Sequence, residues 1–488
     1  MDKKKSIKKN YIYNLMYQIL IILLPIITTP YLSRVLGAER IGIYSYILSI
    51  TTYFILFGSL GVAMYGQREI AYNQDNKEKR SIIFFEVFIM KIITLAISML
   101  IFFIAFCSHG KYAIYYNILL LEIVANMLDI SWFFQGLEEF KKTVVRNTIV
   151  KIISVICIFV FIKTKEDLLL YFVIYVLSTF LGNLSFFLYI PKLVNKVPIK
   201  ELKPFRHLKP TIGLFIPQIA IQLYTVLDKT MIGAIIPDKS EVGYYEQAQK
   251  IVKLLLTLAT SLGTVMVPRM ASTFAEGDFE KLKEYMDRSF RFICMIVFPI
   301  MFGLISISKK FVPIFFGPGY DKVVYLMCLI SPILLMIGLS NVIGTQYLIP
   351  TKRQKEFTIS VTCGAITNFV LNLILIYKFK SIGASIATVV AETVVTGVQF
   401  YLVRKDIRFI DVIKKIKNYF FASSIMFAIS MLIGYFIKQG MISIIVQVAV
   451  SGVTYFGILL LMKDKLLKEG LVIINQKIKK EIWRVGRK

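Results

Sequence analysis

Long apolar runs separated by short polar stretches dominate this chain. A helix that crosses a membrane needs about 20 predominantly apolar residues, and runs of this length recur from residue 12 to residue 462. Their pattern predicts fourteen spans and therefore an all-α polytopic membrane protein. The predicted spans are 12–36, 41–66, 81–106, 112–135, 142–163, 167–190, 211–236, 244–271, 286–308, 322–349, 356–377, 381–403, 416–437 and 441–462.

The longest polar interruption in the first half, 191–210, is basic and punctuated by prolines, and it follows six spans. After the first span stands ERIGIY, with Gly42 and Tyr44, and after the seventh stands SEVGYY, with Gly243 and Tyr245. Because six crossings restore the orientation, the two copies are expected to be parallel repeats, as in several transporters. We predict two pseudo-symmetric six-helix lobes, 1–190 and 211–404, around a basic linker, 191–210, followed by two more spans in 405–462 and a basic tail, 463–488.

Composition agrees with this interpretation, and charge adds an orientation. The chain is 57% hydrophobic and 18% charged, which is far too apolar for a soluble protein of 488 residues. The net charge of +28 is concentrated in the loops that face inside if the N-terminus is cytoplasmic, as the positive-inside rule requires. An even number of spans then places both termini in the cytoplasm. The basic charge therefore indicates membrane topology and contact with anionic membrane lipids, and no nucleic-acid partner is expected.

Polar side chains inside the predicted spans are the candidates for function. An unpaired charge at the centre of a membrane helix costs about 3 kcal/mol on insertion scales. In the seventh span, Gln218, Gln222 and Lys229 share one helix face, and in the eleventh Asn368 and Asn372 do the same. Such stripes are expected to face protein or water and not lipid.

Each charge inside a span has two interpretations. The deep lysines form salt bridges with acidic residues of other helices, or they contact a negatively charged substrate. Arg34 and Arg146 lie near span ends, where a long side chain can also reach the headgroups. Lys91 follows Glu86 by five positions, a poor spacing for a pair on one helix, so its partner is expected elsewhere. The deep lysines with both interpretations are Lys151, Lys229 and Lys253, and their acidic candidates are Glu86, Glu122, Asp129 and Glu392.

Motifs of several catalytic classes do not occur in the sequence. It has no GxxxxGK[ST] loop and no HExxH, so nucleotide hydrolysis and zinc-peptidase chemistry are not expected. The five cysteines are isolated and no CxxC spacing occurs, so neither disulfides nor a metal site is expected. The outer loops are too short for the acidic site of a membrane glycosyltransferase. We therefore expect a transporter and not an enzyme, without a cofactor, and coupled to a gradient of H⁺ or Na⁺ if it is coupled at all.

Several blocks resemble a known family. TPYLSRVLGAERIGIYSY, DISWFFQGLEEFKK and GYYEQAQKIV are similar to Wzx-type polysaccharide-unit flippases of the multidrug/oligosaccharidyl-lipid/polysaccharide exporter superfamily. The resemblance extends from about residue 8 to residue 460. It implies a fourteen-span, two-lobe fold in the bacterial cytoplasmic membrane. It also implies that an undecaprenyl-pyrophosphate-linked oligosaccharide, an O-antigen or capsule repeat unit, crosses by alternating access, with polymerase or assembly proteins as further partners.

The resemblance also implies roles for individual residues. Basic side chains of a cavity would hold the pyrophosphate, and amide side chains would bind sugar hydroxyls. The cationic set is Arg34, Arg146, Lys151, Lys229, Lys253 and Arg269, and the amide set is Gln218, Gln222, Asn368 and Asn372. The expected charge partners or proton carriers are Glu86, Lys91, Glu122, Asp129, Asp228 and Glu392.

Two other transporter functions stay open. LSRVLG also resembles the lipid II flippases, which move the peptidoglycan precursor, although the DISWFFQGLEEF block and the basic linker fit that family less well. A multidrug cation antiporter of the same superfamily would use buried carboxylates, for which Glu122, Asp129 and Glu392 are candidates. The deep lysines would repel such a cation.

Overall fold

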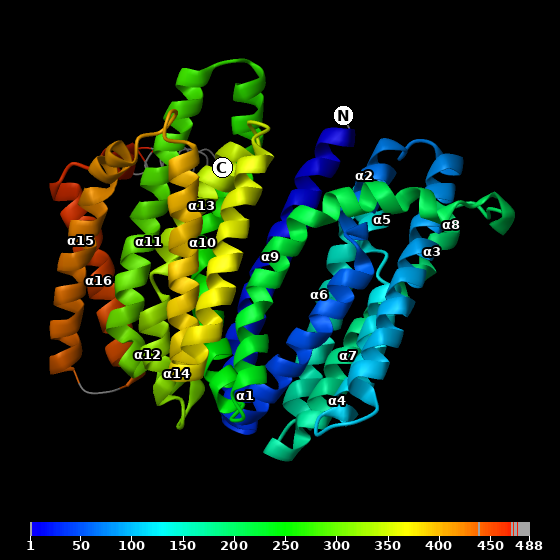
Figure 1. The fold of residues 1–488 in the computed structure, drawn as a ribbon. Coiled ribbons are helices and arrows are strands. Elements are labelled where there is room, and N and C mark those ends of the chain that lie inside the picture. Colours follow the sequence, from blue (N-terminus) through cyan, green and yellow to red (C-terminus); the bar gives the residue numbers. More distant parts are fainter. Residues whose placement is uncertain (1, 438–439, 470–471, 473–475, 477–488) are drawn as a thin grey trace, which may run out of the picture. The chain divides into compact units, whose positions relative to one another are not determined.

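The computed structural model describes residues 2–437, 440–469, 472 and 476, without the side chains of 2–18, 140–141, 216–218, 220–224, 262 and 264–265. In this part of the chain every regular element is a helix (Figure 1). The chain divides into two compact units, Met1–Gly243 and Tyr244–Lys488. The all-α class predicted from the apolar runs is confirmed.

The first unit contains nine α-helices joined by short turns and single helical turns. They are α1 (Asp2–Ser59), α2 (Val62–Tyr72), α3 (Lys77–Phe102), α4 (Ala113–Met127), α5 (Ser131–Gly136), α6 (Phe140–Phe161), α7 (Leu168–Leu184), α8 (Ile190–Leu193) and α9 (Leu208–Ile235). The shorter elements are η1 (Phe103–Cys107), η2 (Lys165–Asp167), η3 (Ser185–Leu188), η4 (Ile199–Glu201) and η5 (Pro204–His207).

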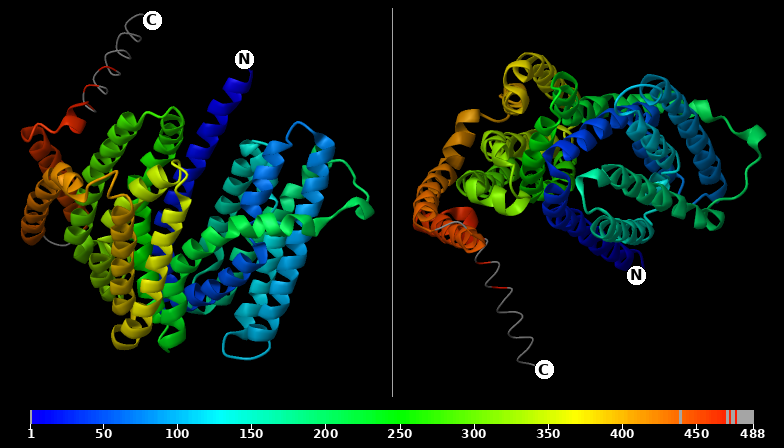
Figure 2. Two further views of the ribbon diagram at one scale, coloured as in Figure 1. Left: turned by 45° about the horizontal axis from the view of Figure 1, so that its top comes forward. Right: turned by 90° about the horizontal axis from the view of Figure 1, so that it is seen from below.

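The second unit is built from the remaining helices. They are α10 (Ser240–Ala275), which begins at the end of the first unit, α11 (Phe279–Phe316), α12 (Asp321–Ile330), α13 (Ile333–Ser340), the π-helix η6 (Asn341–Leu348), α14 (Gln354–Leu402), α15 (Phe409–Phe436) and α16 (Met441–Leu461). In both views of Figure 2, α15 and α16 lie together, coloured orange to red. The Ser306 and Ser430 hydroxyls, 2.9 Å apart, join α15 to α11, and Gln447 of α16 donates to the Ser430 carbonyl of α15 at 2.9 Å.

Two of the long helices are each broken at one residue. In α1 the break is Gly37, with φ 76°, and in α14 it is Lys380, with φ 54°. A positive φ is readily adopted by glycine and costs other residues conformational energy. These breaks fall between the predicted spans 12–36 and 41–66 and between 356–377 and 381–403. Each of these helices therefore consists of two helical segments.

Ten helical segments in the described residues are long and apolar enough to cross a membrane. An eleventh is obtained if the bent pair Ser240–Ser261 and Met266–Ala275 is one span. The polytopic class is confirmed, while the number fourteen and the side on which the termini lie stay predictions. The segments Ile19–Tyr72 and Gln354–Leu402 each enter this count once, although each contains one of the breaks.

The DISWFFQGLEEF block contains α5, which packs on α2 at two glycines. A Cβ atom added at Gly66 would lie 2.4 Å from the Trp132 ring, and one at Gly136 would lie 2.7 Å from the Gln67 carbonyl oxygen. Trp132 and the two phenylalanines that follow it are almost fully buried. Because only a hydrogen fits at these crossings, the block determines how closely α5 approaches α2.

The glycines of the two similar motifs ERIGIY and SEVGYY lie at a direct main-chain contact within the first unit. A Cβ at Gly42 would lie 1.7 Å from the Lys239 carbonyl oxygen, and one at Gly243 would lie 2.0 Å from the Ala38 carbonyl oxygen. Lys239 donates to the Ile236 carbonyl at 2.9 Å and lies over the Tyr46 ring. Burial, and to a smaller extent Lys111, lowers the pKa of this lysine. The two glycines let α1 meet the turn after α9 at backbone contact.

The basic linker is folded against α3. Glu86, 1% exposed, accepts a hydrogen bond from the Lys203 amide at 2.7 Å and pairs with Arg206 at 2.5 Å. Its second oxygen also lies 2.8 Å from Nε2 of His207, whose Nδ1 is 2.6 Å from the Tyr65 hydroxyl. His207 is the last residue of η5 and is buried. These partners of Glu86 thus come from the linker that precedes α9, and His207 connects them to Tyr65 of α2.

Candidate functional site

The first unit contains a polar cavity of about 490 Å³ lined by residues of α1, α6 and α7. Two members of the predicted cationic set, Arg146 and Lys151, line it. Most of its other polar lining consists of amides and hydroxyls: Tyr44, Asn147, Ser154, Tyr171, Tyr175, Ser178, Thr179 and Asn183. A cavity of this size and polarity inside a membrane-spanning bundle is suited to a polar ligand.

Helical periodicity explains how these side chains reach one place. On α7, Tyr171, Tyr175, Thr179 and Asn183 recur every four residues, and on α6 Asn147 and Lys151 do the same. Residues four apart lie on one face of a helix. The polar faces of α6 and α7 therefore meet at the cavity, because these two helices pack against each other.

Arg146 is held by protein groups on one side of the cavity. Its Nε donates to the Gly182 carbonyl at 2.6 Å, and Nη2 donates to Oδ1 of Asn183 at 2.6 Å. Asn183 in turn donates to the Ala125 carbonyl at 2.7 Å, and the guanidinium lies 4.1 Å from the centre of the Phe186 ring. This chain of contacts ties α6 to α7 and α4. One interpretation of the sequence had the Arg146 side chain reach the lipid headgroups. In the structure it is bound by protein groups.

Lys151 lies just over one turn beyond Arg146 on α6 and is half-buried. Its position in the cavity wall places a second positive charge in the same lining. Ser154 follows on the same wall. The cavity thus has a cationic side made by α6.

Tyrosines form another part of the wall. The ring of Tyr44 in α1 lies 4.7 Å from the ring of Tyr171 and 5.9 Å from that of Tyr175, measured between centroids. Glu122 of α4 is 4% exposed and lies next to Tyr175 and Thr179. Asn126 donates to the Glu122 main-chain carbonyl at 2.9 Å. A buried carboxyl group thus stands directly behind the tyrosines.

Other predicted residues of the first unit lie away from this cavity. Arg34 is exposed and donates to the Pro30 carbonyl at 3.2 Å. Lys91 is buried and donates to the Asp129 carbonyl at 2.8 Å, so its partner does come from another segment, as expected. Asp228 is buried and Lys229 half-buried, both in α9. Glu86 binds the linker, as described above.

In the second unit, the predicted residues are spread over α10 and α14. Lys253 is half-buried and Arg269 exposed in α10, and Glu392 is buried in α14. Asn368 and Asn372 of α14 are fully buried, and Asn372 donates to Asn368 at 3.0 Å. Gln218 and Gln222, in α9 of the first unit, lie outside the described side chains. Their proposed roles therefore stay predictions.

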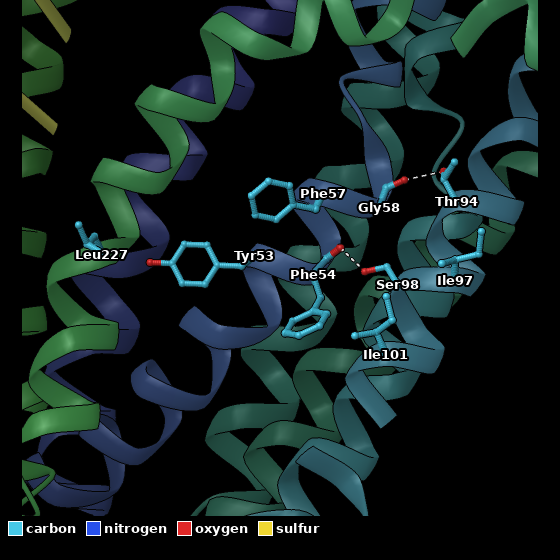
Figure 3. Close-up of a pocket in the computed structure, with 9 residues that line it drawn as sticks. All are labelled: Tyr53, Phe54, Phe57, Gly58, Thr94, Ile97, Ser98, Ile101 and Leu227. Atoms are coloured by element: carbon cyan, nitrogen blue, oxygen red, sulfur yellow. Dashed lines mark hydrogen bonds between the residues drawn. The ribbon is translucent and has the colours of Figure 1, made fainter. Parts of the chain in front are cut away.

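A second hollow in the first unit, of about 580 Å³, is apolar (Figure 3). Figure 3 shows two of its few polar side chains turned to the main chain of α1: Thr94 donates to the Gly58 carbonyl at 2.6 Å, and Ser98 donates to the Phe54 carbonyl at 2.7 Å. Phenylalanine, isoleucine and leucine side chains make up most of the remaining wall. This hollow offers no group that would hold an anion.

The prediction from sequence missed the tyrosines and Asn183. A signal was present, since Tyr171, Tyr175, Thr179 and Asn183 follow a four-residue spacing within an apolar span. Tyr44 gave no such signal. Its role depends on a neighbour more than 120 positions away in the chain.

Comparison with known proteins identifies the family. The polysaccharide biosynthesis protein family matches residues 7–274, more than half of the chain. The chain belongs to this family. The MatE family also matches residues 214–377. Together these matches confirm the resemblance to Wzx-type members of the exporter superfamily.

An individual relative and two solved structures are consistent with this family. A protein of Escherichia coli strain K12 described as a candidate O-antigen transporter is 28% identical over 411 residues, which cover 83% of this chain and 98% of the relative. The solved structure of the lipid II flippase MurJ in an inward closed conformation has a TM-score of 0.75 at 17% identity, covering 93% of this chain and 99% of that one. An inward-facing MATE-family multidrug transporter has a TM-score of 0.62 at 13% identity, covering 80% and 96%. These structures share the fold, and the protein is a multi-pass transporter of the bacterial cytoplasmic membrane.

Proposed function

We propose that this protein moves undecaprenyl-pyrophosphate-linked oligosaccharide repeat units from the cytoplasmic to the outer leaflet. The observation that carries the proposal is the polar cavity of the first unit, lined by Arg146 and Lys151 inside apolar helices. A pyrophosphate carries about two negative charges at neutral pH, and neither it nor a glycan crosses hydrocarbon unaided. Cationic side chains supply charge-assisted hydrogen bonds to phosphate oxygens.

Alternating access between two six-helix lobes is the mechanism we propose. Its support is the number of membrane-length helices: ten or eleven in the described residues, of which two contain breaks, and in addition α9, with 28 residues. If the bent pair counts as one span, dividing the two broken helices and adding α9 gives fourteen, the number expected from the sequence. The basic inner loops support cytoplasmic termini.

The remaining predicted residues are proposed to act along the transport path. Lys229, Lys253, Arg34 and Arg269 would contact the pyrophosphate outside the cavity, and Gln218, Gln222, Asn368 and Asn372 would serve the glycan. The buried acidic residues Glu122, Asp228 and Glu392 are the candidates for coupling to H⁺ or Na⁺. Polymerase and assembly proteins would receive the product outside.

Removing the Lys151 charge tests this proposal. A lysine–phosphate contact is worth about 1.5–3 kcal/mol, so Lys151→Ala is expected to lower the initial transport rate about tenfold or more. The measurement is appearance of lipid-linked repeat units on the far side of proteoliposomes, with Lys151→Arg retaining part of the rate. The matched control is Lys200→Ala in the exposed linker helix η4, expected to transport as the wild type does. Wild-type transport by a correctly inserted Lys151→Ala variant would refute the cationic-cavity proposal.

The lipid II flippase is the second candidate, because the MurJ structure shares the fold over nearly the whole chain. Expression in a strain depleted of its own lipid II flippase separates the two functions. We expect no rescue of growth, and rescue would favour lipid II as the substrate. A cation antiporter is disfavoured by the two positive charges of the cavity wall.

A further inference from the structure

The polar cavity of the first unit joins two kinds of chemistry. Its α6 wall is cationic, with Lys151 and Arg146, and its α1 and α7 walls carry Tyr44, Tyr171 and Tyr175. A simple anion would need only the first wall. The combination suits a ligand that has a charged part directly attached to a ring with hydroxyl groups.

We propose that this cavity binds the glycosyl diphosphate end of the substrate, with the first sugar ring against Tyr44 and Tyr171 and the diphosphate at Lys151. This inference rests on the proposed function and deepens it, since it assigns a substrate part to each wall. The sugars farther from the diphosphate lie outside the cavity and do not contact its residues.

The tyrosine wall offers aromatic surface on which a sugar ring can pack. The Tyr44 and Tyr171 rings are 4.7 Å apart and tilted by 52°, and both side chains are half-buried, so they line the cavity without being sealed in the core. Aromatic faces bury the apolar C–H face of a ring and leave its hydroxyls free for hydrogen bonds. The two tyrosines come from α1 and α7, so their arrangement is fixed by the packing of these helices.

Hydroxyl groups beside the tyrosines can bind the sugar's own hydroxyls. Ser178 donates to the Tyr175 carbonyl at 2.8 Å, which leaves the lone pairs of its oxygen to accept from a ligand. Ser154 stands on the α6 wall in the same lining. The first sugar would thus be held by ring contact on one side and by hydroxyls on the other.

The size of the cavity limits what it can hold. At about 490 Å³ it lies in the usual range for small-molecule sites. That space accommodates one sugar with its diphosphate and not a repeat unit of several sugars. The site is therefore expected to select for the phosphate-proximal sugar and to accept repeat units that differ farther along the glycan.

Binding of two matched probes tests the inference. The probes are a short-chain polyprenyl diphosphate that carries one N-acetylhexosamine and the same diphosphate without sugar, added to the purified full-length protein in nanodiscs. Tyr44→Leu and Tyr171→Leu are expected to weaken binding of the glycosylated probe about tenfold and to leave the bare diphosphate unchanged. Tyr44→Phe and Tyr171→Phe keep the ring and are expected to bind both probes as the wild type does.

Two controls separate this inference from the proposed function. Tyr115→Leu replaces a half-buried tyrosine that packs on Phe172 outside the cavity lining, and it should change neither affinity. Lys151→Ala should weaken the binding of both probes equally. If the leucine variants weaken the binding of both probes equally, or of neither probe, the assignment of the sugar to the tyrosines is wrong. The diphosphate site is not affected by that result. If the wild type binds neither probe, the proposed function itself fails.

Discussion

At the scale of single residues, buried charges in this protein are engaged by groups that are distant in sequence. Glu86 binds Arg206 and His207, more than 100 positions later, and Lys91 donates to the Asp129 main chain. Because an unpaired charge in a membrane bundle is costly, such contacts stabilise helix packing. Arg146 follows the same principle and contributes a cation to the cavity as well.

Replacing Arg146 by lysine separates its charge from its geometry. Lysine keeps the positive charge but cannot reproduce the forked contacts with Gly182 and Asn183. We expect Arg146→Lys to lower the free energy of unfolding by about 1–3 kcal/mol, seen as a lower melting temperature in detergent. Asn183→Ala, which removes an acceptor and no charge, should have a comparable effect. A melting temperature equal to the wild type in both variants would show that the contacts of Arg146 with Gly182 and Asn183 do not stabilise the fold.

At the scale of elements, close helix crossings depend on glycine. Lipid is as apolar as leucine, so membrane helices associate through tight packing of small residues and through polar contacts. Gly66 with Trp132 is a crossing of this kind within the first unit, and Gly42 lets α1 approach the turn after α9 in the same way. The polar counterpart is the contact of Arg146 with α7.

Adding a methyl group at Gly42 is expected to disrupt the contact between α1 and the turn after α9. The new Cβ would lie 1.7 Å from the Lys239 carbonyl oxygen, and main chain on both sides cannot move aside as a flexible side chain could. We expect Gly42→Ala to cost about 3 kcal/mol or more and to reduce the amount of folded protein on size-exclusion chromatography. Gly397→Ala in α14 is the matched control, since nothing lies within 4 Å of its added Cβ. Equal yields of folded protein for the two variants would show that the main chains at Gly42 and Lys239 are not in tight contact.

At the scale of the whole molecule, family membership and the apolar segments agree on a multi-pass transporter. The glycosylated, lipid-linked substrate that we propose would require a polar site inside that apolar structure. The cavity of the first unit provides one. The orientation of the chain then decides from which side it is loaded.

Reporter fusions test the fourteen-span orientation. With both termini cytoplasmic, reporters placed after Gly110 and Gly319 should report the outside, and reporters after Gly277 and at the C-terminus should report the cytoplasm. A pair of alkaline phosphatase and green fluorescent protein fusions gives opposite signals at each site. A C-terminal fusion active outside would mean an odd number of crossings.

The amino-acid sequence by itself determined the fold class, the breaks near Gly37 and Lys380, and the helix faces on which polar residues recur. These depend on local hydropathy and on spacing along one helix, which sequence contains directly. It also placed Arg146 and Lys151 among the candidates for a cationic site.

Only the tertiary structure decided which faces meet. It brought Tyr44 of α1 to Tyr171 and Tyr175 of α7, joined His207 to Glu86, and left Asn368 and Asn372 bonded to each other in the core. Apolar periodicity cannot select helix partners in lipid. Lipid solvates every apolar helix face about equally well, so there is no hydrophobic driving force toward one particular neighbour. The partners are selected by shape, by small residues and by polar contacts between helices, which exist only once the chain has folded.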